Sequence, residues 1–344
     1  MAHQYVAVLW NRQKKLYDLY IFLGIILYLL AFIVLTMILK PNITEEALII
    51  RASGSLSILI LHIILIIGPL SRLNTRFLPL LYNRRHLGVT MFLIAFIHGG
   101  FSIIQFHALG NVNPLVSIFV SNNEYGDLLN FPFQTLGFFA LIILFLMAAT
   151  SHDFWLTNLG PRFWKAMHMM VYVAYALVIL HVALGIAQSE PEPIMLTLLG
   201  IGLFTIVILH LMTAFKEVKN DREKSLNQRG YVLVGTVEEI PENKAVTINV
   251  NGEKVAIFKY DGKLSAVSNV CRHQNGPLGE GKIVDGCITC PWHGYQYLPH
   301  NGCSPPPFTE KVETFDIVLE DNKVYLNPKP YEPGTERSPV VISS

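Results

Sequence analysis

The strongest constraint on the fold of this chain is a series of long apolar runs, all of which lie within its first 215 residues. A helix of about 17 to 25 predominantly apolar residues can cross a bilayer. Six stretches are long and apolar enough, and they cover residues 17–39, 47–70, 87–106, 133–150, 163–186 and 194–215. The sequence therefore predicts a membrane-embedded, all-α bundle of six helices.

The overall composition supports this prediction and narrows the functional classes. Hydrophobic residues make up 52% of the 344 residues and charged residues only 15%, whereas charged residues make up about 25% of an average soluble domain. The formal net charge is +1, so the chain lacks the basic field that nucleic-acid binding requires. We expect the membrane, and no nucleic acid, among its partners. Because the first apolar run is itself a full span, we expect no removable signal peptide.

Basic residues are concentrated in the loops on one side of the predicted bundle, and they indicate its orientation. The basic residues on this side are Arg12, Lys14, Lys15, Arg72, Arg76, Arg84, Arg85, Arg162, Lys165, Lys216, Lys219, Arg222 and Lys224. The loops on the other side contain a single basic residue, Lys40, beside several acidic ones. Loops rich in Lys and Arg stay in the cytoplasm. We therefore expect a multi-pass protein of the cell inner (plasma) membrane with both termini in the cytoplasm.

The pattern changes after residue 215, where a polar, charged segment leads into a region with the features of a soluble domain. Short runs of β-branched residues then alternate with turn signals. Asn251-Gly252 and Asp261-Gly262 each join two such runs, an arrangement that predicts tight antiparallel hairpins. We expect four parts: a transmembrane domain (1–215), a linker (216–230), a small all-β domain (231–330) and a loose tail (331–344).

Two short motifs in the predicted β domain combine cysteine with histidine. Cys271 and His273 form a C-x-H motif, and Cys290 and His293 form a C-x-x-H motif after a gap of sixteen residues. Two cysteines and two histidines can hold zinc, or a [2Fe–2S] cluster with the cysteines on one iron and the histidines on the other. Because each motif supplies one ligand of each kind, the pattern favours the cluster and leaves zinc as the alternative.

The remaining cysteines, Cys287 and Cys303, fit no ligand spacing. We interpret both as ordinary thiols, because nothing in their surroundings completes a second motif.

Residues 230–328 resemble a Rieske ferredoxin-type domain, and the segment CRHQNGPLGEGKIVDGCITCPWHGYQY matches its cluster-binding signature. The resemblance implies that Cys271 and Cys290 ligate one iron of a [2Fe–2S] cluster. By the same resemblance, His273 and His293 ligate the other iron.

Two positions distinguish this segment from the Rieske proteins of cytochrome bc type. Their disulfide between the two loops would fall at Gly276 and Trp292, so that bridge cannot form here. The serine that they direct at a cluster sulfide corresponds to Tyr295, although Tyr297 keeps an aromatic hydroxyl. Fewer hydrogen bonds to sulfur imply a lower potential within the Rieske range of about −150 to +300 mV. We expect a ferredoxin-like cluster.

Histidines recur at matching positions in two of the predicted spans. In the fifth span, His168 and His181 are 13 residues apart, which is about 20 Å along a helix. The third span runs in the same direction and contains His86 and His98, 12 residues apart. A haem held between helices needs a histidine from each helix, so this agreement predicts His98 with His181 and His86 with His168 as b-haem ligands.

Other membrane histidines have simpler interpretations. His107 competes with His98 and His86 as a ligand of the third span. His62 and His210 are interpreted as partners in hydrogen bonds between helices, because a polar group in a bundle is commonly paired in this way.

Residues 45–186 resemble the ferric-reductase-like transmembrane family, and within it the haem-binding membrane subunit of periplasmic methionine sulfoxide reductase. The matching segments include NRRHLGVTMFLIAFIH at 83–98 and LGPRFWKAMHMMVYVAYALVILH at 159–181. The resemblance implies that His98, His168 and His181 are haem ligands, and it gives less support to His86. One or two b haems are therefore expected.

These parts together predict an oxidoreductase component for electron transport. The chain has no G-x-G-x-x-G unit on a strand–helix turn, so a flavin and nicotinamide domain is not indicated and a separate partner is needed. We expect electrons to pass from a cytoplasmic flavoprotein reductase or ferredoxin through the cluster and the b haems. Their acceptor would be quinone or an extracytoplasmic redox partner.

Two alternatives remain open. The chain could be an accessory redox or docking subunit of a larger respiratory or photosynthetic complex, or a quinol-oxidising Rieske/cytochrome b protein with its cluster outside the cytoplasm. An oxygenase is not supported, because the sequence offers neither a mononuclear iron set of two histidines and a carboxylate nor a histidine box.

Overall fold

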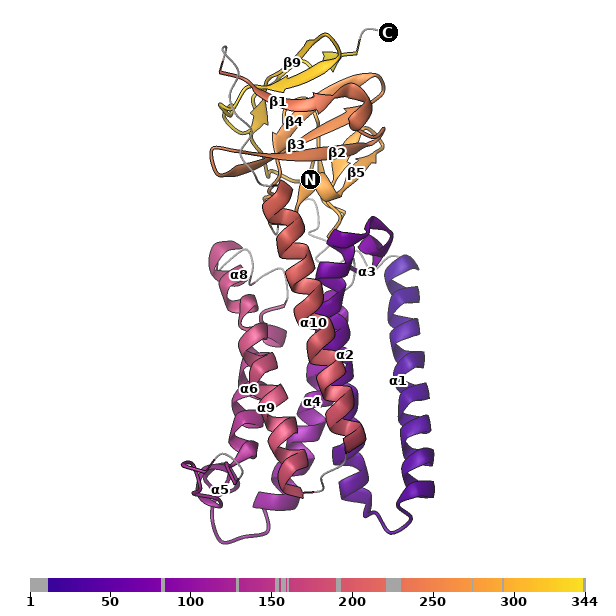
Figure 1. Cartoon of the computed structure of the whole chain (residues 1–344), viewed down its shortest axis with the longest axis vertical. Coiled ribbons are helices and arrows are strands. Elements are labelled where there is room, and N and C mark those ends of the chain that lie inside the picture. The colour runs from indigo at the N-terminus through magenta and orange to yellow at the C-terminus, as the bar shows by residue number, and fades with distance from the viewer. Residues whose placement is uncertain are drawn as a thin grey trace. The chain divides into compact units, whose positions relative to one another are not determined.

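The structure is a computed structural model of the chain, drawn in Figure 1. It describes residues 12–81, 84–127, 130–151, 155, 159, 161–189, 193–220, 230–273, 275–292 and 294–342. The chain divides into two compact units. One is helical and comprises mainly residues 6–67 and 83–209, and the other comprises mainly residues 68–82 and 210–344.

Long apolar helices make up most of the first unit. Their bounds are α1 (Arg12–Leu39), α2 (Glu45–Leu73), α4 (Arg84–His107), α6 (Phe133–Ala149), α9 (Val171–Ser189) and α10 (Pro193–Asn220). Five candidate spans are long and apolar enough to cross a membrane, and α6 is a shorter apolar helix of 17 residues. The predicted all-α membrane class is confirmed.

The number of helices exceeds the predicted six, for two physical reasons. The connections between spans are themselves partly helical, as in α3 (Leu78–Leu81) and α5 (Pro114–Val120). The fifth span is also interrupted at Met170, which separates α8 (Pro161–Met169) from α9. In addition, α10 continues to Asn220 and therefore enters the segment expected to be a linker.

Contacts within the helical unit concentrate on three helices. The helix α6 packs extensively against α9, and α4 packs against α6. The helix α1 is the least buried of the candidate spans, because no residue in its most apolar stretch is buried. Outward-facing apolar side chains are typical of helices that are surrounded by lipid tails. The candidate histidines His98 and His181 thus lie on two of these three helices, α4 and α9, whereas His168 lies on α8.

The second unit contains the β domain, which is built from antiparallel strands. The strands are β1 (Val232–Thr236), β2 (Lys244–Val250), β3 (Glu253–Tyr260), β4 (Lys263–Ser268), β5 (Lys282–Val284), β6 (Cys287–Thr289), β7 (Gln296–Tyr297), β8 (Thr314–Phe315), β9 (Ile317–Glu320), β10 (Lys323–Leu326) and β11 (Val340–Val341). They form three sheets with the orders β1-β10-β9, β11-β4-β3-β2 and β5-β6-β7, and β8 also pairs with β4.

Both predicted hairpins are present in this domain. Asn251 and Gly252 join β2 to β3 with φ angles of 52° and 79°, and Asp261 and Gly262 join β3 to β4 with φ angles of 46° and 66°. Two consecutive residues with positive φ define the tight turn that matches the twist of paired strands. The local sequence therefore sets the register of the central sheet.

The strand β3 separates two buried layers. Val255 and Ile257 face the main apolar core of the domain, whereas the alternate residues Ala256 and Phe258 face a second cluster that contains the two candidate ligand cysteines. All four of these side chains are fully buried. Because successive side chains of a strand point to opposite faces, one strand supports both the domain core and the loops with the candidate ligand cysteines.

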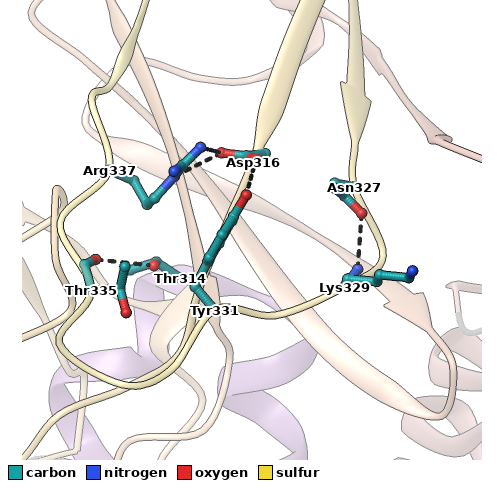
Figure 2. A network of polar contacts seen from close by, with 7 residues as sticks. All are labelled: Thr314, Asp316, Asn327, Lys329, Tyr331, Thr335 and Arg337. Carbon is teal, nitrogen blue, oxygen red and sulfur yellow. Dashed lines mark hydrogen bonds and ion pairs between the residues drawn. The ribbon is translucent and has the colours of Figure 1, made fainter.

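The C-terminal segment is ordered against the domain, so the prediction of a loose tail is wrong for residues 331–342. The strand β11 pairs with β4, and Val340 lies opposite Leu264. The Arg337 guanidinium and the Tyr331 hydroxyl both donate hydrogen bonds to the Asp316 carboxylate (Figure 2). The same guanidinium lies 4.2 Å from the centroid of the Tyr331 ring. One carboxylate thus fixes two points of the tail.

Replacing this carboxylate tests its role. We expect Asp316→Ala to increase hydrogen exchange of the amides in residues 331–342 by about tenfold, because charged hydrogen bonds are among the stronger ones that hold a surface segment. Hydrogen-exchange mass spectrometry of the full chain measures this. Asn327→Ala is the matched control, because Asn327 lies in the same network but accepts only from the Lys329 amide. Equal protection in both variants would contradict the role given to Asp316.

Candidate redox centres

The first candidate cluster loop, residues 271–276, is closed by two backbone hydrogen bonds. The Cys271 N–H donates to the Gly276 carbonyl at 2.9 Å, and the Asn275 N–H donates to the Cys271 carbonyl at 2.7 Å. Asn275 has a φ of 56°, a left-handed conformation that asparagine adopts more readily than most residues. The loop therefore turns sharply around the cysteine.

The second loop, residues 290–295, repeats the same pattern. The Cys290 N–H donates to the Tyr295 carbonyl at 2.8 Å, and the Gly294 N–H donates to the Cys290 carbonyl at 3.0 Å. Gly294, at the position equivalent to Asn275, has a φ of 70°. Two loops of equal length and equal hydrogen bonding thus present one cysteine each.

Both cysteines are buried in the same apolar cluster, with exposed fractions of 1% for Cys271 and 2% for Cys290. His273 is half-buried, and its Nδ1 atom has no exposed surface. Its ring stacks on the ring of Tyr295, with centroids 4.7 Å apart and an interplanar angle of 5°. The fourth predicted ligand, His293, lies outside the described residues. All four cysteines of the chain are free of disulfides.

The position of Gly276 admits no side chain. A Cβ atom there would lie 2.8 Å from the Cys290 sulfur and 3.1 Å from a ring carbon of Trp292. The two loops therefore approach each other across a glycine at the point where the cysteine sulfur lies. Two buried thiols and an imidazole with an inward nitrogen fit the ligand set of a Rieske [2Fe–2S] cluster. Among the described residues, no group of three or more possible ligand side chains lies close enough together to hold a metal ion.

A fully buried tyrosine supports the first loop. The Tyr297 hydroxyl oxygen lies 3.4 Å from the Cys271 sulfur and accepts a hydrogen bond from the Arg272 N–H at 2.9 Å. Because the backbone N–H already supplies a proton to this oxygen, the hydroxyl proton is available to the sulfur. Burial, followed by the neighbouring Cys271, raises the pKa of Tyr297, so the phenol stays protonated.

Tyr295 is anchored at its hydroxyl, which donates to the Glu310 carboxylate. Burial is the first cause that raises the pKa of Tyr295, and the bond to Glu310 is the second. Sequence reasoning missed Glu310 because no spacing relates it to the ligand motifs. The acidic side chain is found only once residues 295–310 fold back on the loop.

In the helical unit, His98 of α4 and His181 of α9 face each other. Their ring centroids are 6.1 Å apart with an interplanar angle of 78°. The Nδ1 atom of His98 lies 2.9 Å from the Ile50 carbonyl, and that of His181 lies 2.8 Å from the Phe133 carbonyl. Two nitrogen–metal bonds of about 2 Å each, together with the ring radii, account for this separation. The pair therefore fits a metal between two Nε2 atoms.

The other predicted pair is not brought together in the same way. The His168 ring stacks on Trp164 with centroids 3.8 Å apart, and its Nδ1 bonds to the Trp164 carbonyl at 3.0 Å. Its Nε2 is buried and has no hydrogen-bond partner among the described residues. His86 instead pairs with the Asp18 carboxylate at 3.0 Å. Within the described part of the chain, no ring contact joins His86 to His168.

Two further histidines have partners at both ring nitrogens. His107 contacts the Ser117 hydroxyl at 2.9 Å and the Gln134 amide oxygen at 3.1 Å, so it has no nitrogen left for a metal. His62 bonds to the Tyr175 hydroxyl at 3.2 Å, which confirms its predicted hydrogen bond between helices. The structure thus removes His107 as a competitor of His98.

Two family models match separate parts of the chain. The family model for the Rieske [2Fe-2S] domain matches residues 230–316, and that for the ferric reductase like transmembrane component matches residues 53–179. The 3-phenylpropionate/cinnamic acid dioxygenase ferredoxin subunit of Photorhabdus laumondii is 31% identical over 99 residues, which are 28% of this chain and 91% of that protein.

A second relative and a solved structure are each similar to part of the chain. The biphenyl dioxygenase ferredoxin subunit of Pseudomonas sp. KKS102 is 32% identical over 95 residues, which are 27% of this chain and 86% of that protein. The ferredoxin of carbazole 1,9a-dioxygenase from Nocardioides aromaticivorans has 24% identity and a TM-score of 0.28, with coverage of 29% of this chain and 98% of that chain.

The chain is therefore a membrane redox protein with a soluble iron–sulfur domain. It belongs to the Rieske [2Fe–2S] family through its β domain. Its helical region is a ferric reductase-like transmembrane component. The [2Fe–2S] cofactor follows from this membership.

A substitution at Gly276 tests the contact between the loops. We expect Gly276→Ala to lower iron and sulfide content per chain by about tenfold, because groups that position metal ligands carry effects of this size. Gly252→Asn is the control, because Gly252 lies in a turn of the same domain, asparagine tolerates its positive φ, and nothing lies within 4 Å of its Cβ position. Normal cluster content in Gly276→Ala would show that the loops do not need this close approach.

The Tyr297 hydroxyl offers a second test. We expect Tyr297→Phe to keep the cluster but to lower its reduction potential by about 59 mV. This shift corresponds to a tenfold change in a one-electron equilibrium. The reason is that a hydrogen bond to the ligand sulfur favours the reduced, more negative cluster. Redox titration followed by electron paramagnetic resonance measures the shift. An unchanged potential would exclude a hydrogen bond from this hydroxyl to sulfur in the loaded protein.

Proposed function

We propose that this protein is an electron-transfer subunit that passes single electrons between a cytoplasmic donor, a Rieske cluster and b haem in the membrane. Quinone or an extracytoplasmic redox partner is the proposed acceptor. The observation that carries the proposal is the facing pair of His98 and His181 in a chain that also presents two buried cysteines on matched loops. Two separate one-electron centres in one chain suit electron transfer.

The proposed cluster ligands are Cys271 and Cys290 on one iron and His273 and His293 on the other. When bound, the cluster supplies one-electron exchange at a site within reach of a partner. The chain contributes the rest: it buries the two sulfurs, holds the Tyr297 hydroxyl beside Cys271, and fixes the plane of His273 against Tyr295. Each contribution limits the rearrangement that accompanies a change of charge.

The proposed ligands of b haem are His98 and His181, with His168 as a ligand of a second haem. The bonds from Nδ1 to backbone carbonyls leave Nε2 of His98 and His181 for iron, and the buried Nε2 of His168 is available in the same sense. His86 is retained as a weaker candidate, because its Nδ1 is engaged by a carboxylate and its ring does not face His168. When bound, haem supplies reversible one-electron chemistry.

The proposed location is the cell inner (plasma) membrane. In the proposed orientation, both termini and the β domain lie in the cytoplasm. This orientation is supported by the basic loops. Because the chain has no nucleotide-binding motif, the proposed donor is a cytoplasmic flavoprotein reductase or ferredoxin. The relatives named as ferredoxin subunits of dioxygenases agree with a Rieske domain that exchanges electrons with a separate protein.

Spectroscopy of the purified full chain tests both centres. We expect a rhombic Rieske-type paramagnetic resonance signal and a b-haem α band after reduction with dithionite. His293→Ala should remove the first signal only, because it removes an iron ligand of the cluster. His98→Ala or His181→Ala should reduce the α band only. His300→Ala and His107→Gln are the matched controls and should keep both signals.

Composition and topology provide the contradicting outcomes. Zinc in place of iron, or protein without porphyrin, would rule out the proposal. One haem per chain would retire the pairing of His86 with His168. A C-terminal epitope accessible in inverted but not in right-side-out vesicles is expected, and the opposite result would favour the quinol-oxidising alternative with its cluster outside the cytoplasm.

A further inference from the structure

The two facing histidines of the helical unit share an unusual backbone environment. His98 bonds through Nδ1 to the carbonyl of Ile50 on α2. In an α-helix this carbonyl also accepts the amide four residues later, which is the amide of Gly54. A Cβ atom at Gly54 would lie 2.8 Å from Nδ1 and 2.9 Å from Cε1 of His98. The imidazole therefore occupies space that any side chain at position 54 would take.

The same arrangement recurs at His181. Its Nδ1 bonds to the carbonyl of Phe133 on α6, and the residue four positions later is Gly137. A Cβ atom at Gly137 would lie 2.8 Å from both Nδ1 and Cε1 of His181. Different helices thus supply the same combination of a carbonyl and a glycine to the two rings of one facing pair.

The geometry also fixes the tautomer of both rings. A backbone carbonyl oxygen can only accept a hydrogen bond, so Nδ1 carries the proton in each imidazole. The neutral ring then has its lone pair on Nε2. Because both rings are bonded through Nδ1, both present Nε2 as the metal-binding nitrogen.

Glycines elsewhere in the bundle do not share this role. Gly88 and Gly100 on α4 and Gly200 on α10 have nothing within 4 Å of their Cβ positions. Gly202 does approach a histidine, but there the contact is with Nε2 of His62 at 2.2 Å, and that nitrogen already bonds to the Tyr175 hydroxyl. The carbonyl and glycine combination is confined, within the described helices, to the proposed ligand pair.

We propose that Gly54 and Gly137 are positioning residues for the axial imidazoles of the b haem, and that they hold each Nδ1–H against a helix carbonyl. This inference rests on the proposed function. A strong hydrogen bond from Nδ1 makes the imidazole a better electron donor to its metal. Bonding of this kind on both sides stabilises oxidised iron and lowers the haem reduction potential. The two glycines therefore set the electrochemistry of the site as well as its shape.

The test compares Gly54→Ala and Gly137→Ala with Gly88→Ala and Gly100→Ala in the full-length purified protein. The added methyl group displaces the ring from the carbonyl in the first two variants only. We expect the haem midpoint potential of these two variants to rise by about 59 mV, which corresponds to a tenfold change in a one-electron redox equilibrium. The g values of the oxidised low-spin haem should also change, whereas both controls should match the wild type.

The Rieske paramagnetic resonance signal of the same samples serves as an internal check of folding. Unchanged potential and g values in both test variants, with the Rieske signal intact, would overturn the inference. Wild-type protein labelled with ¹⁵N-histidine provides a measurement that needs no variant. When the haem iron is reduced to its low-spin, diamagnetic state, we expect two ligand imidazoles with protonated Nδ1 that exchange slowly with D₂O. Their absence would overturn the inference even if the variants fail to fold.

These outcomes are separable from failure of the proposed function. Wild-type protein without haem would remove the function and this inference together. Haem that is lost in His98→Ala but electrochemically unchanged in Gly54→Ala would leave the function intact and remove only the role of the glycines.

Discussion

The two candidate centres depend on one constraint: a metal-binding side chain in apolar surroundings must be held by the backbone, at a distance that only glycine permits. The Cβ positions of Gly276, Gly54 and Gly137 each lie 2.8 Å from an atom of a candidate ligand residue. A buried polar atom without a hydrogen-bond partner costs free energy. A backbone carbonyl is a partner whose position does not depend on a side-chain rotamer. A candidate ligand side chain held close to the backbone can bind a metal from one direction only.

The β domain applies this constraint through the alternation of one strand. Because β3 sends Ile257 to the main core and Phe258 to the layer of the ligand loops, the loops rest on a surface that the rest of the domain already stabilises. The loops themselves are short and each is closed by two backbone bonds. Rigid support of this kind keeps a redox site in one geometry while its charge changes.

The sequence predicted those features that depend on local patterns. Apolar runs identified the spans, and Asn251-Gly252 and Asp261-Gly262 identified two hairpins, because a tight turn needs positive φ at adjacent residues. The order of the tail was missed, since it depends on an ion pair between Asp316 and Arg337 that no local pattern encodes. The glycines beside the histidines were missed for a related reason: which residues of two helices meet is decided by packing, and spacing within one helix carries no information about it.

The membrane histidines differ in the partner of Nδ1, and this difference distinguishes them as candidate ligands. For His98 and His181 the partner is a carbonyl on another helix, so the ring is fixed relative to the bundle. For His168 the partner is the Trp164 carbonyl of its own helix, so this bond does not fix the ring relative to the other helices. His86 bonds to the Asp18 carboxylate from α1, a helix whose apolar window is not buried. Of the candidate ligands, His98 and His181 are therefore the pair whose rings are held by the backbone of other helices.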